Sequence, residues 1–339
     1  MKQKPRIILG ILAAVLAIAL FGGGIYAIEK WSDRGERSSG EEADNETLLY
    51  LGDEIYELNN NIESYLIIGT DNSGNEKAEG TDEYRGSMAD FLLLLVINKT
   101  DETYGFLQID RNTITDIMCI DTEGNSLGEV KEQLCCAHWY GGDPEQGCNN
   151  TVYTVSELVG SLPIDGYFSM HMSDIGILNH AVGGVEVTLQ DDFSAQFPEM
   201  TKGKTLTLTD EEAEAYVRSR MDIGGGTNVE RMDRQTTYMQ AFKAKAIKLA
   251  KDDPDFVEDL YDKLLASSGV TDIPGSQLSV IMNQIYKGED LGILRLEGET
   301  NEGRILDDGL LHEEFYPTDE SITEAMKTLC GLTDDDLTE

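Results

Sequence analysis

Four arginines stand close together in the second half of the chain and have the chemistry of an anion site. They are Arg218, Arg220, Arg231 and Arg234, in a sequence of 339 residues that has eleven arginines and a formal net charge of -38. The guanidinium group is planar, permanently charged and forked, which suits bidentate contact with phosphate oxygens. The cluster therefore indicates a phosphorylated ligand. A lattice of ion pairs with nearby acidic residues is the alternative, because runs of charge are usually solvated surface.

Two aspartates and a fifth arginine lie at the ends of expected strands. Asp71 follows the apolar run 65–69, Asp90 directly precedes the run 91–97, and Arg111 follows the expected strand 105–109. Ligands of α/β proteins bind at strand ends, and two carboxylates beside arginines fit a divalent cation that bridges to phosphate oxygens. The alternative is that each aspartate caps a turn or a helix.

The elements that must position these residues alternate along the chain between strand and helix patterns. The runs 65–69, 91–97 and 105–109 are mostly apolar, as in inner strands of a covered sheet. Further strands are expected at 166–170, 185–189 and 292–296, and helices at 152–158, 174–181, 210–217, 231–251, 254–265 and 275–286. This alternation predicts an α/β fold, a three-layer α/β/α sandwich with a central mixed sheet, over residues 62–332.

The N-terminal segment predicts a membrane anchor. Residues 7–28 are 22 positions without a charge, and a helix of this length, at ~1.5 Å per residue, spans a hydrocarbon core of ~30 Å. Lys2, Lys4 and Arg6 precede it, so the positive-inside rule places residues 1–6 in the cytoplasm and the chain after the helix outside the cell. The alternative is a cleaved signal peptide, but its apolar region is typically only ~7–15 residues long.

The acidic composition limits the partners of the region beyond the anchor. The chain has 64 acidic against 26 basic residues, which repel a nucleic-acid backbone, so no nucleic-acid partner is expected. Residues 29–61 are polar and mostly acidic and predict an extracytoplasmic linker with one partial helix at 48–58. Residues 333–339 predict a frayed acidic tail.

Five cysteines follow the apolar segment, and they contain no C-x-x-C pair. An oxidising compartment without metal-ligand spacing favours a disulfide over zinc. A bridge from Cys135 or Cys136 to Cys148 would close a glycine-rich loop, and the spacing leaves the connectivity open.

Six motifs together resemble the LytR-CpsA-Psr family of bacterial membrane-anchored phosphotransferases. They occur in the family's order between residues 64 and 250: IIGTD (67–71), ADFL (89–92), IDRNT (109–113), PIDGYF (163–168), AVGGVEV (181–187) and the arginine stretch AYVRSR (215–220) with RMDRQ (231–235). Any one motif is weak, whereas six in order are specific.

The resemblance implies an enzyme that buries a polyprenyl tail in an apolar pocket and holds its pyrophosphate at the mouth. By this analogy Asp71 and Asp90 bind Mg²⁺ (or Mn²⁺), and the catalytic residues are Asp90, Arg111, Arg218 and Arg220. The implied pyrophosphate-binding residues are Arg111, Arg218, Arg220, Arg231, Arg234 and Gln235. The implied reaction moves a glycopolymer phosphate from a polyprenyl pyrophosphate carrier to a peptidoglycan hydroxyl, outside the membrane of a Gram-positive type of cell.

Two positions depart from the family's pattern. Met88 stands where members commonly have arginine, with Arg85 upstream as a substitute, and Asn112 stands where they usually have aspartate. An amide neither accepts a proton nor anchors a cation as a carboxylate does. A non-catalytic polyprenyl-pyrophosphate carrier or regulator of wall assembly is therefore the alternative function. A structural adhesin, with the arginines in a salt lattice, is a third.

Overall fold

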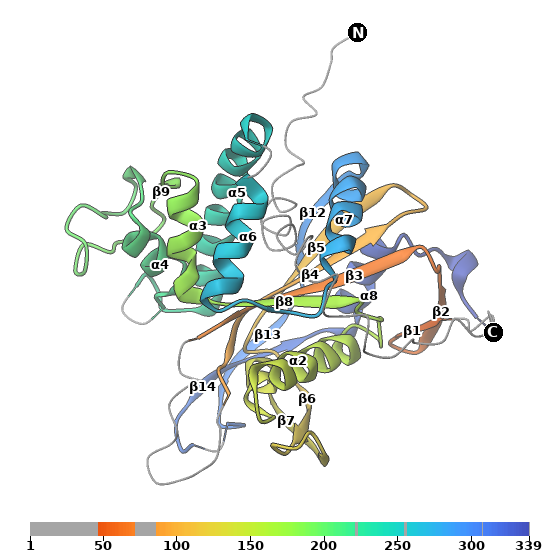
Figure 1. Ribbon diagram of the computed structural model, residues 1–339. Helices are drawn as coiled ribbons and strands as arrows, with labels where there is room; N and C mark the ends of the chain where they lie inside the picture. Colours follow the sequence, from red (N-terminus) through yellow and green to blue (C-terminus); the bar gives the residue numbers. More distant parts are fainter. Residues whose placement is uncertain (1–46, 72–85, 221–222, 254–255, 307, 339) are drawn as a thin grey trace.

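The computed structural model describes residues 47–71, 86–220, 223–253, 256–306 and 308–338 (Figure 1). At its centre is a six-stranded mixed sheet with the order β11-β8-β3-β4-β5-β12. Strand β3 runs parallel to β8 and β5 runs parallel to β12, whereas the other neighbours are antiparallel. The strands are β3 (Ile62–Thr70), β4 (Ala89–Asn98), β5 (Thr103–Ile109), β8 (Gly166–His171), β11 (Val270–Thr271) and β12 (Glu289–Arg295).

Successive residues of the inner strands point to opposite faces of the sheet, and both faces are buried. Tyr65 and Ile67 of β3 belong to one hydrophobic core, whereas Leu66 and Ile68 belong to a second core on the other side. Strands β4 and β5 divide in the same way. Continuous apolar runs have this two-sided burial because side chains alternate along a strand.

Helices cover both faces, which confirms a mixed α/β fold around a central mixed sheet (Figure 1). The first core is closed by α3 (Ile175–Ala181), α4 (Asp210–Arg218), α5 (Asn228–Asp252), α6 (Phe256–Ser267) and α7 (Gly275–Lys287). The second core is closed by α2 (Pro144–Leu158) and α8 (Asp319–Cys330). Each helix expected between residues 152 and 286 overlaps one of these elements, with ends that differ by a few residues, so helical periodicity located these helices.

Residues 47–58 form a β-hairpin, and the prediction of a partial helix there was wrong. Strand β1 (Thr47–Leu51) pairs with β2 (Glu54–Leu58) across a turn in which Gly52 has a φ of 62°, a conformation that favours glycine. Leu49 and Tyr56 are fully buried in the second core. The burial alternates with a period of two, as in a strand. The folded region therefore begins before residue 62.

Further hairpins extend the fold beyond the predicted elements. They are β6 (Ile114–Ile120) with β7 (Ser126–Gln133), β9 (Glu186–Thr188) with β10 (Thr205–Thr207), and β13 (Gly298–Gly303) with β14 (His312–Pro317). Strand β9, expected at 185–189, thus pairs with β10 outside the central sheet. Short 3-10 turns are η2 (Leu134–Trp139), η3 (Met172–Asp174) and η4 (Asp334–Asp336).

The predicted acidic tail is paired rather than frayed. Leu337 forms a bridge with Tyr56, and the N–H of Thr338 donates to the carbonyl of Ile55 at 2.9 Å. The exposed edge of β2 therefore holds the last residues that the structure describes. The predicted membrane segment, 7–28, lies outside the described residues, and no helix within them is long and apolar enough to cross a membrane.

Candidate functional site

The adjacent ends of β3 and β4 bring the two predicted aspartates to one edge of the sheet. Thr70 pairs with Ala89, and the N–H of Asp71 donates to the carbonyl of Met88 at 3.1 Å. The N–H of Met88 in turn donates to Asp71 Oδ1 at 3.0 Å. Asp71 therefore leaves β3 beside the point at which Asp90 enters β4.

Asp90 is the centre of a cluster with two buried arginines. Its Oδ1 lies 3.1 Å from Arg111 Nη1 and 3.9 Å from Arg231 Nη1. Arg111 follows β5 and Arg231 lies near the N-terminus of α5, so β4, β5 and α5 converge here. The Arg111 and Arg231 side chains are only 14% and 6% exposed. We call Asp90, Arg111 and Arg231 the Asp90 cluster.

Both arginines of the Asp90 cluster keep one donor unused. The Nε–H groups of Arg111 and Arg231 are buried and have no hydrogen-bond partner among the described residues. An unsatisfied buried donor costs ~1–3 kcal/mol, more if it is charged, and native structures keep few of them. Two such donors on neighbouring guanidinium groups indicate a site for an acceptor-rich anion.

Burial and neighbouring charges act in opposite directions on these arginines. Burial lowers the pKa of Arg231 to about 10; Asp90 opposes this decrease, whereas the charges of Arg111 and Arg220 add to it. Burial also lowers the pKa of Arg111, but Cys135 and Asp90 raise it above its ordinary value. Arg231 thus carries a positive charge that its surroundings disfavour, and a bound anion would stabilise it.

The structure places Arg218 and Arg220 differently with respect to the Asp90 cluster. Arg218, the last residue of α4, donates to Glu214 Oε1 at 2.5 Å within the same helix, and its side chain is 32% exposed. Arg220 lies near enough to the cluster for its charge to lower the pKa of Arg231. Arg218 therefore forms an ion pair of the kind that the alternative in the sequence analysis describes, whereas the anion contact of Arg220 stays a prediction.

Arg234 is held by the protein itself. Its side chain is fully buried and donates from Nε to the carbonyl of Tyr216 at 3.0 Å, from Nη1 to Asp191 Oδ2 at 2.7 Å, and from Nη2 to the carbonyl of Ser219. Every nitrogen of the guanidinium group thus donates to a protein oxygen. The geometry indicates that Arg234 fastens the end of α4 to α5, which differs from the predicted contact with pyrophosphate.

Gln235 lies between the Asp90 cluster and the first core. Its Nε2 donates to the carbonyl of Val217 at 3.2 Å, and its Oε1 accepts from Gln108 Nε2 at 3.3 Å. Both Gln235 and Val217 also line a cavity. Gln235 is therefore fixed in orientation at the boundary between polar and apolar parts of the site.

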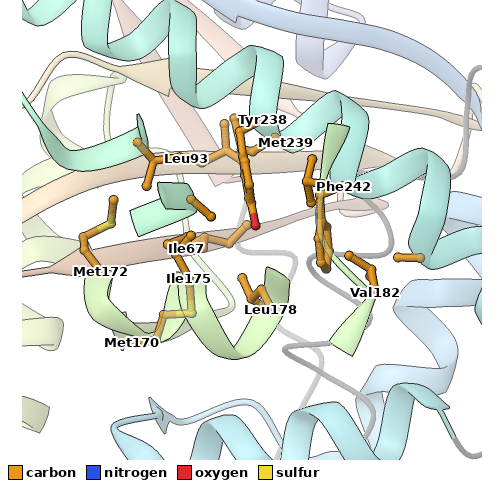
Figure 2. Close-up of a cluster of buried hydrophobic side chains, with 14 of the residues drawn as sticks. Ile67, Leu93, Met170, Met172, Ile175, Leu178, Val182, Tyr238, Met239 and Phe242 are labelled. Atoms are coloured by element: carbon orange, nitrogen blue, oxygen red, sulfur yellow. The ribbon is translucent and has the colours of Figure 1, made fainter. Parts of the chain in front are cut away.

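A small apolar cavity of about 40 Å³ lies between the sheet and helices α3 and α5. Figure 2 shows several of its lining side chains, among them Ile67, Ile175 and Phe242. Phe91, which follows Asp90, and Gln235, one helical turn after Arg231, both line it. The cavity therefore adjoins the Asp90 cluster. Its full lining is Ile67, Ile68, Gly69, Phe91, Met170, Met172, Ile175, Leu178, Val217, Gln235, Tyr238, Met239 and Phe242.

The sequence of the chain matches a known family over most of its length. The LytR_cpsA_psr family model matches residues 27–324. The chain belongs to this family. A TagU of Halalkalibacterium halodurans, named a polyisoprenyl-teichoic acid–peptidoglycan teichoic acid transferase, is 26% identical over 249 residues, which cover 70% of this chain and 71% of that protein. A TagU of Bacillus cereus with the same name is 27% identical over 245 residues, with 70% and 71% covered.

Solved structures share the fold of this LytR-CpsA-Psr chain. The protein gbs0355 of Streptococcus agalactiae superposes with a TM-score of 0.59 at 20% identity and covers 82% of this chain and 91% of its own. TagT bound to LI-WTA superposes with a TM-score of 0.55 at 20% identity, with 80% and 92% covered. Bacillus subtilis TagV gives a TM-score of 0.55 at 21% identity, with 81% and 100% covered.

The two departures from the LytR-CpsA-Psr pattern flank Arg111 in the structure. Met88 Sδ lies 2.8 Å from Arg111 Nη2, so a thioether occupies the position at which members commonly have arginine. Asn112 is buried, and its Oδ1 lies 3.5 Å from Gln133 Nε2. Arg85, the expected substitute for Met88, lies outside the described residues.

The five cysteines all lie within the described residues and are free, so the predicted disulfide from Cys135 or Cys136 to Cys148 was wrong. Cys148 Sγ faces His138 Nε2 at 3.5 Å, whereas Cys135 Sγ lies 4.0 Å from Cys136 Sγ and 2.9 Å from Arg111 Nη2. Burial raises the pKa of the Cys135 thiol. The hydrogen bond with Cys136 and the charge of Arg111 outweigh this effect and lower the pKa to about 7. Cys135 is a neighbour of Arg111 that spacing alone did not reveal.

Proposed function

We propose that this LytR-CpsA-Psr protein is a membrane-anchored transferase that attaches a polyprenyl-pyrophosphate-linked glycopolymer to peptidoglycan outside the cell. Relatives that are 26% and 27% identical are named teichoic acid transferases. The observation that carries the proposal is the pair of buried, unpartnered Nε–H groups of Arg111 and Arg231 next to an apolar cavity. A lipid pyrophosphate has both the acceptor oxygens and the apolar tail that this arrangement fits.

The proposed reaction transfers the glycopolymer phosphate from the phosphoanhydride of the lipid pyrophosphate to a hydroxyl. The oxygen of a peptidoglycan hydroxyl attacks the phosphorus that carries the glycopolymer, and the hydroxyl proton passes to water. A new phosphorus–oxygen bond forms, the bond to the bridging oxygen of the pyrophosphate breaks, and polyprenyl phosphate leaves. Arg111 and Arg231 stabilise the negative charge that develops on the phosphate oxygens, with the charge of Arg220 nearby.

The carboxylates of Asp71 and Asp90 fit Mg²⁺ (or Mn²⁺) in type and number. Mg²⁺ prefers oxygen ligands and is commonly held by one or two carboxylates together with waters and substrate phosphates. The described residues contain no group of three or more His, Cys, Asp or Glu side chains that would hold a metal without a substrate. When bound, the ion would supply further charge neutralisation at the pyrophosphate.

The apolar cavity is the proposed entrance for the polyprenyl tail. At about 40 Å³ it is smaller than a polyprenyl chain, so its lining must move when the tail enters. Met170, Met172 and Met239 line it, and methionine side chains are unbranched and adapt to irregular spaces. Figure 2 shows Met170 and Met172 beside Ile175 and Leu178, facing Met239 and Tyr238 of α5.

The proposed localisation follows from the uncharged segment 7–28. It would form a single membrane-spanning helix with residues 1–6 in the cytoplasm and the α/β domain outside, where lipid-linked wall polymers and peptidoglycan meet. The alternative is a non-catalytic carrier. Asn112 favours it, because a buried amide at this position cannot accept a proton as a carboxylate would.

The test uses the full-length protein in detergent with Mg²⁺ and a labelled polyprenyl-pyrophosphate-linked glycan. Transfer predicts release of labelled polyprenyl phosphate in the presence of peptidoglycan. Arg231→Met should abolish this release, whereas Arg304→Met should not, because Arg304 is an exposed arginine outside the site. Lipid that copurifies and binds but is never released as polyprenyl phosphate would support the carrier instead. A protein that shows neither lipid binding nor release of polyprenyl phosphate would support the adhesin instead.

A further inference from the structure

A short chain of hydrogen bonds joins a buried carboxylate to the Asp90 cluster. Asn228 Nδ2 donates to Asp110 Oδ1 at 2.6 Å, and Asn228 Oδ1 accepts from Arg231 Nη2 at 2.5 Å. Asp110 and Asn228 are 7% and 1% exposed. The first residue of α5 therefore lies between the end of β5 and the guanidinium group of Arg231.

Asp110 determines which end of the Asn228 amide faces Arg231. Its Oδ1 also accepts the N–H of Asn112 at 2.8 Å, so it acts as an acceptor on two sides. An ionised carboxylate only accepts hydrogen bonds, and a guanidinium group only donates them. The amide must therefore turn its NH₂ to Asp110 and its oxygen to Arg231. In the opposite orientation the amide NH₂ would face the donors of Arg231, and the amide oxygen would face the carboxylate of Asp110.

Residues other than Asn228 cap the N-terminus of α5. The Thr227 hydroxyl accepts the N–H of Glu230, and the Glu230 side chain returns to the Thr227 N–H, which forms a capping box at the start of α5. The N–H of Asn228 donates to Glu313 Oε2 of β14 at 3.2 Å. The Asn228 side chain is thus not needed to begin the helix. It donates weakly to Met232 Sδ at 3.5 Å, and its two shorter hydrogen bonds connect Asp110 with Arg231.

We propose that Asn228, oriented by Asp110, is the positioning residue that holds the Arg231 guanidinium group in place for the pyrophosphate. The inference rests on the proposed function and adds two residues to it. Arg231 donates from Nη2 to Asn228, whereas its Nε–H has no partner among the described residues. The Nε–H is therefore the donor that would contact the ligand. Asn228 acts on the pyrophosphate only through Arg231.

A double-mutant cycle tests whether Asn228 acts through Arg231. Binding of inorganic pyrophosphate with Mg²⁺ is measured by calorimetry on four forms of the full-length protein in detergent: wild type, Asn228→Ala, Arg231→Met and the double variant. Asn228→Ala leaves the net charge unchanged, so its effect reports positioning. We expect it to weaken binding roughly tenfold, the scale of one hydrogen bond to a charged group. In the Arg231→Met background it should have no effect.

Each outcome of the cycle separates the inference from the proposed function. If Arg231→Met binds pyrophosphate as tightly as wild type, both fail, because the site does not hold the anion. If Arg231→Met weakens binding but Asn228→Ala weakens it equally in both backgrounds, only the positioning role is overturned. A general loss of stability would give that additive result, and melting temperatures recorded on the same samples would identify it.

An exchange of the amide and the carboxylate keeps the inference testable if Asn228→Ala does not fold. Asn228→Asp alone places two carboxylates against each other and should weaken pyrophosphate binding roughly tenfold. Combined with Asp110→Asn, the order of donors and acceptors is restored, since an amide then faces a carboxylate that accepts from Arg231. Binding within about twofold of wild type supports the inference. A double variant no better than Asn228→Asp overturns it.

Discussion

Arg231 and Arg234 lie one turn apart on α5, and we expect the same substitution to affect them in opposite ways. Arg234→Met removes a buried ion pair with Asp191, whose side chain is 8% exposed, and two hydrogen bonds to carbonyls at the C-terminal end of α4, those of Tyr216 and Ser219. Breaking one partner of a buried pair costs ~3–5 kcal/mol, because the other charge stays buried without compensation. The variant should therefore melt on the order of 5–15 °C below wild type.

The assay is a thermal melt of the full-length protein followed by pyrophosphate binding at 10 °C, where a destabilised variant remains folded. Arg234→Met should lose stability and keep most of its affinity, whereas Arg231→Met should lose affinity and little stability. Arg304→Met is the matched control, since Arg304 is an exposed arginine outside the site and its loss should change neither the melting temperature nor the affinity. An Arg234→Met protein that melts like wild type but no longer binds pyrophosphate would refute the reasoning.

Three further substitutions or measurements follow from single contacts. Burial raises the pKa of Asp110, and hydrogen bonds from Asn112 and Asn228 partly offset this increase. A carboxyl group whose pKa is raised by folding lowers the stability of the folded state at pH values above that pKa. Asp110→Asn should thus melt above wild type at pH 7, and calorimetric scans should show this difference shrinking as the pH falls towards 3.8, the ordinary pKa; a gap that widens in acid would contradict it. Thiol titration of the denatured, unreduced protein should find five thiols, whereas a disulfide would leave three. Leu49→Ala should cost ~2–5 kcal/mol in denaturant unfolding because Leu49 is fully buried, and a neutral result would mean that the β1–β2 hairpin does not belong to the core.

The inner strands and the longer helices were predictable because their signals are local. In β4 the residues from 91 to 97 are all apolar, and both faces of the strand are buried. The β1–β2 hairpin was missed although its signal is also local. Gly52 and Asp53 form a two-residue turn between segments whose buried positions alternate, and this period of two outweighs a short helical pattern.

The roles of the arginines were not predictable because they depend on distant partners. The residue that engages Arg234, Asp191, lies 43 positions earlier, and Asp110 lies 118 positions before Asn228. Clustering along the sequence groups Arg231 with Arg234, whereas the fold sends one to a buried ion pair and the other to the Asp90 cluster. Sequence spacing finds arginines that could bind phosphate. Burial and donor satisfaction in the fold separate Arg231, which keeps an unpartnered Nε–H, from Arg234, which does not.

The most direct measurement is a structure of the full-length protein in complex with Mg²⁺ and a polyprenyl pyrophosphate. The pyrophosphate should lie within hydrogen-bond distance of Arg111 Nε and Arg231 Nε, beside Asp71 and Asp90, with the tail between Phe91 and α5. A head group bound away from both arginines, or a tail that remains outside a closed first core, would contradict the account.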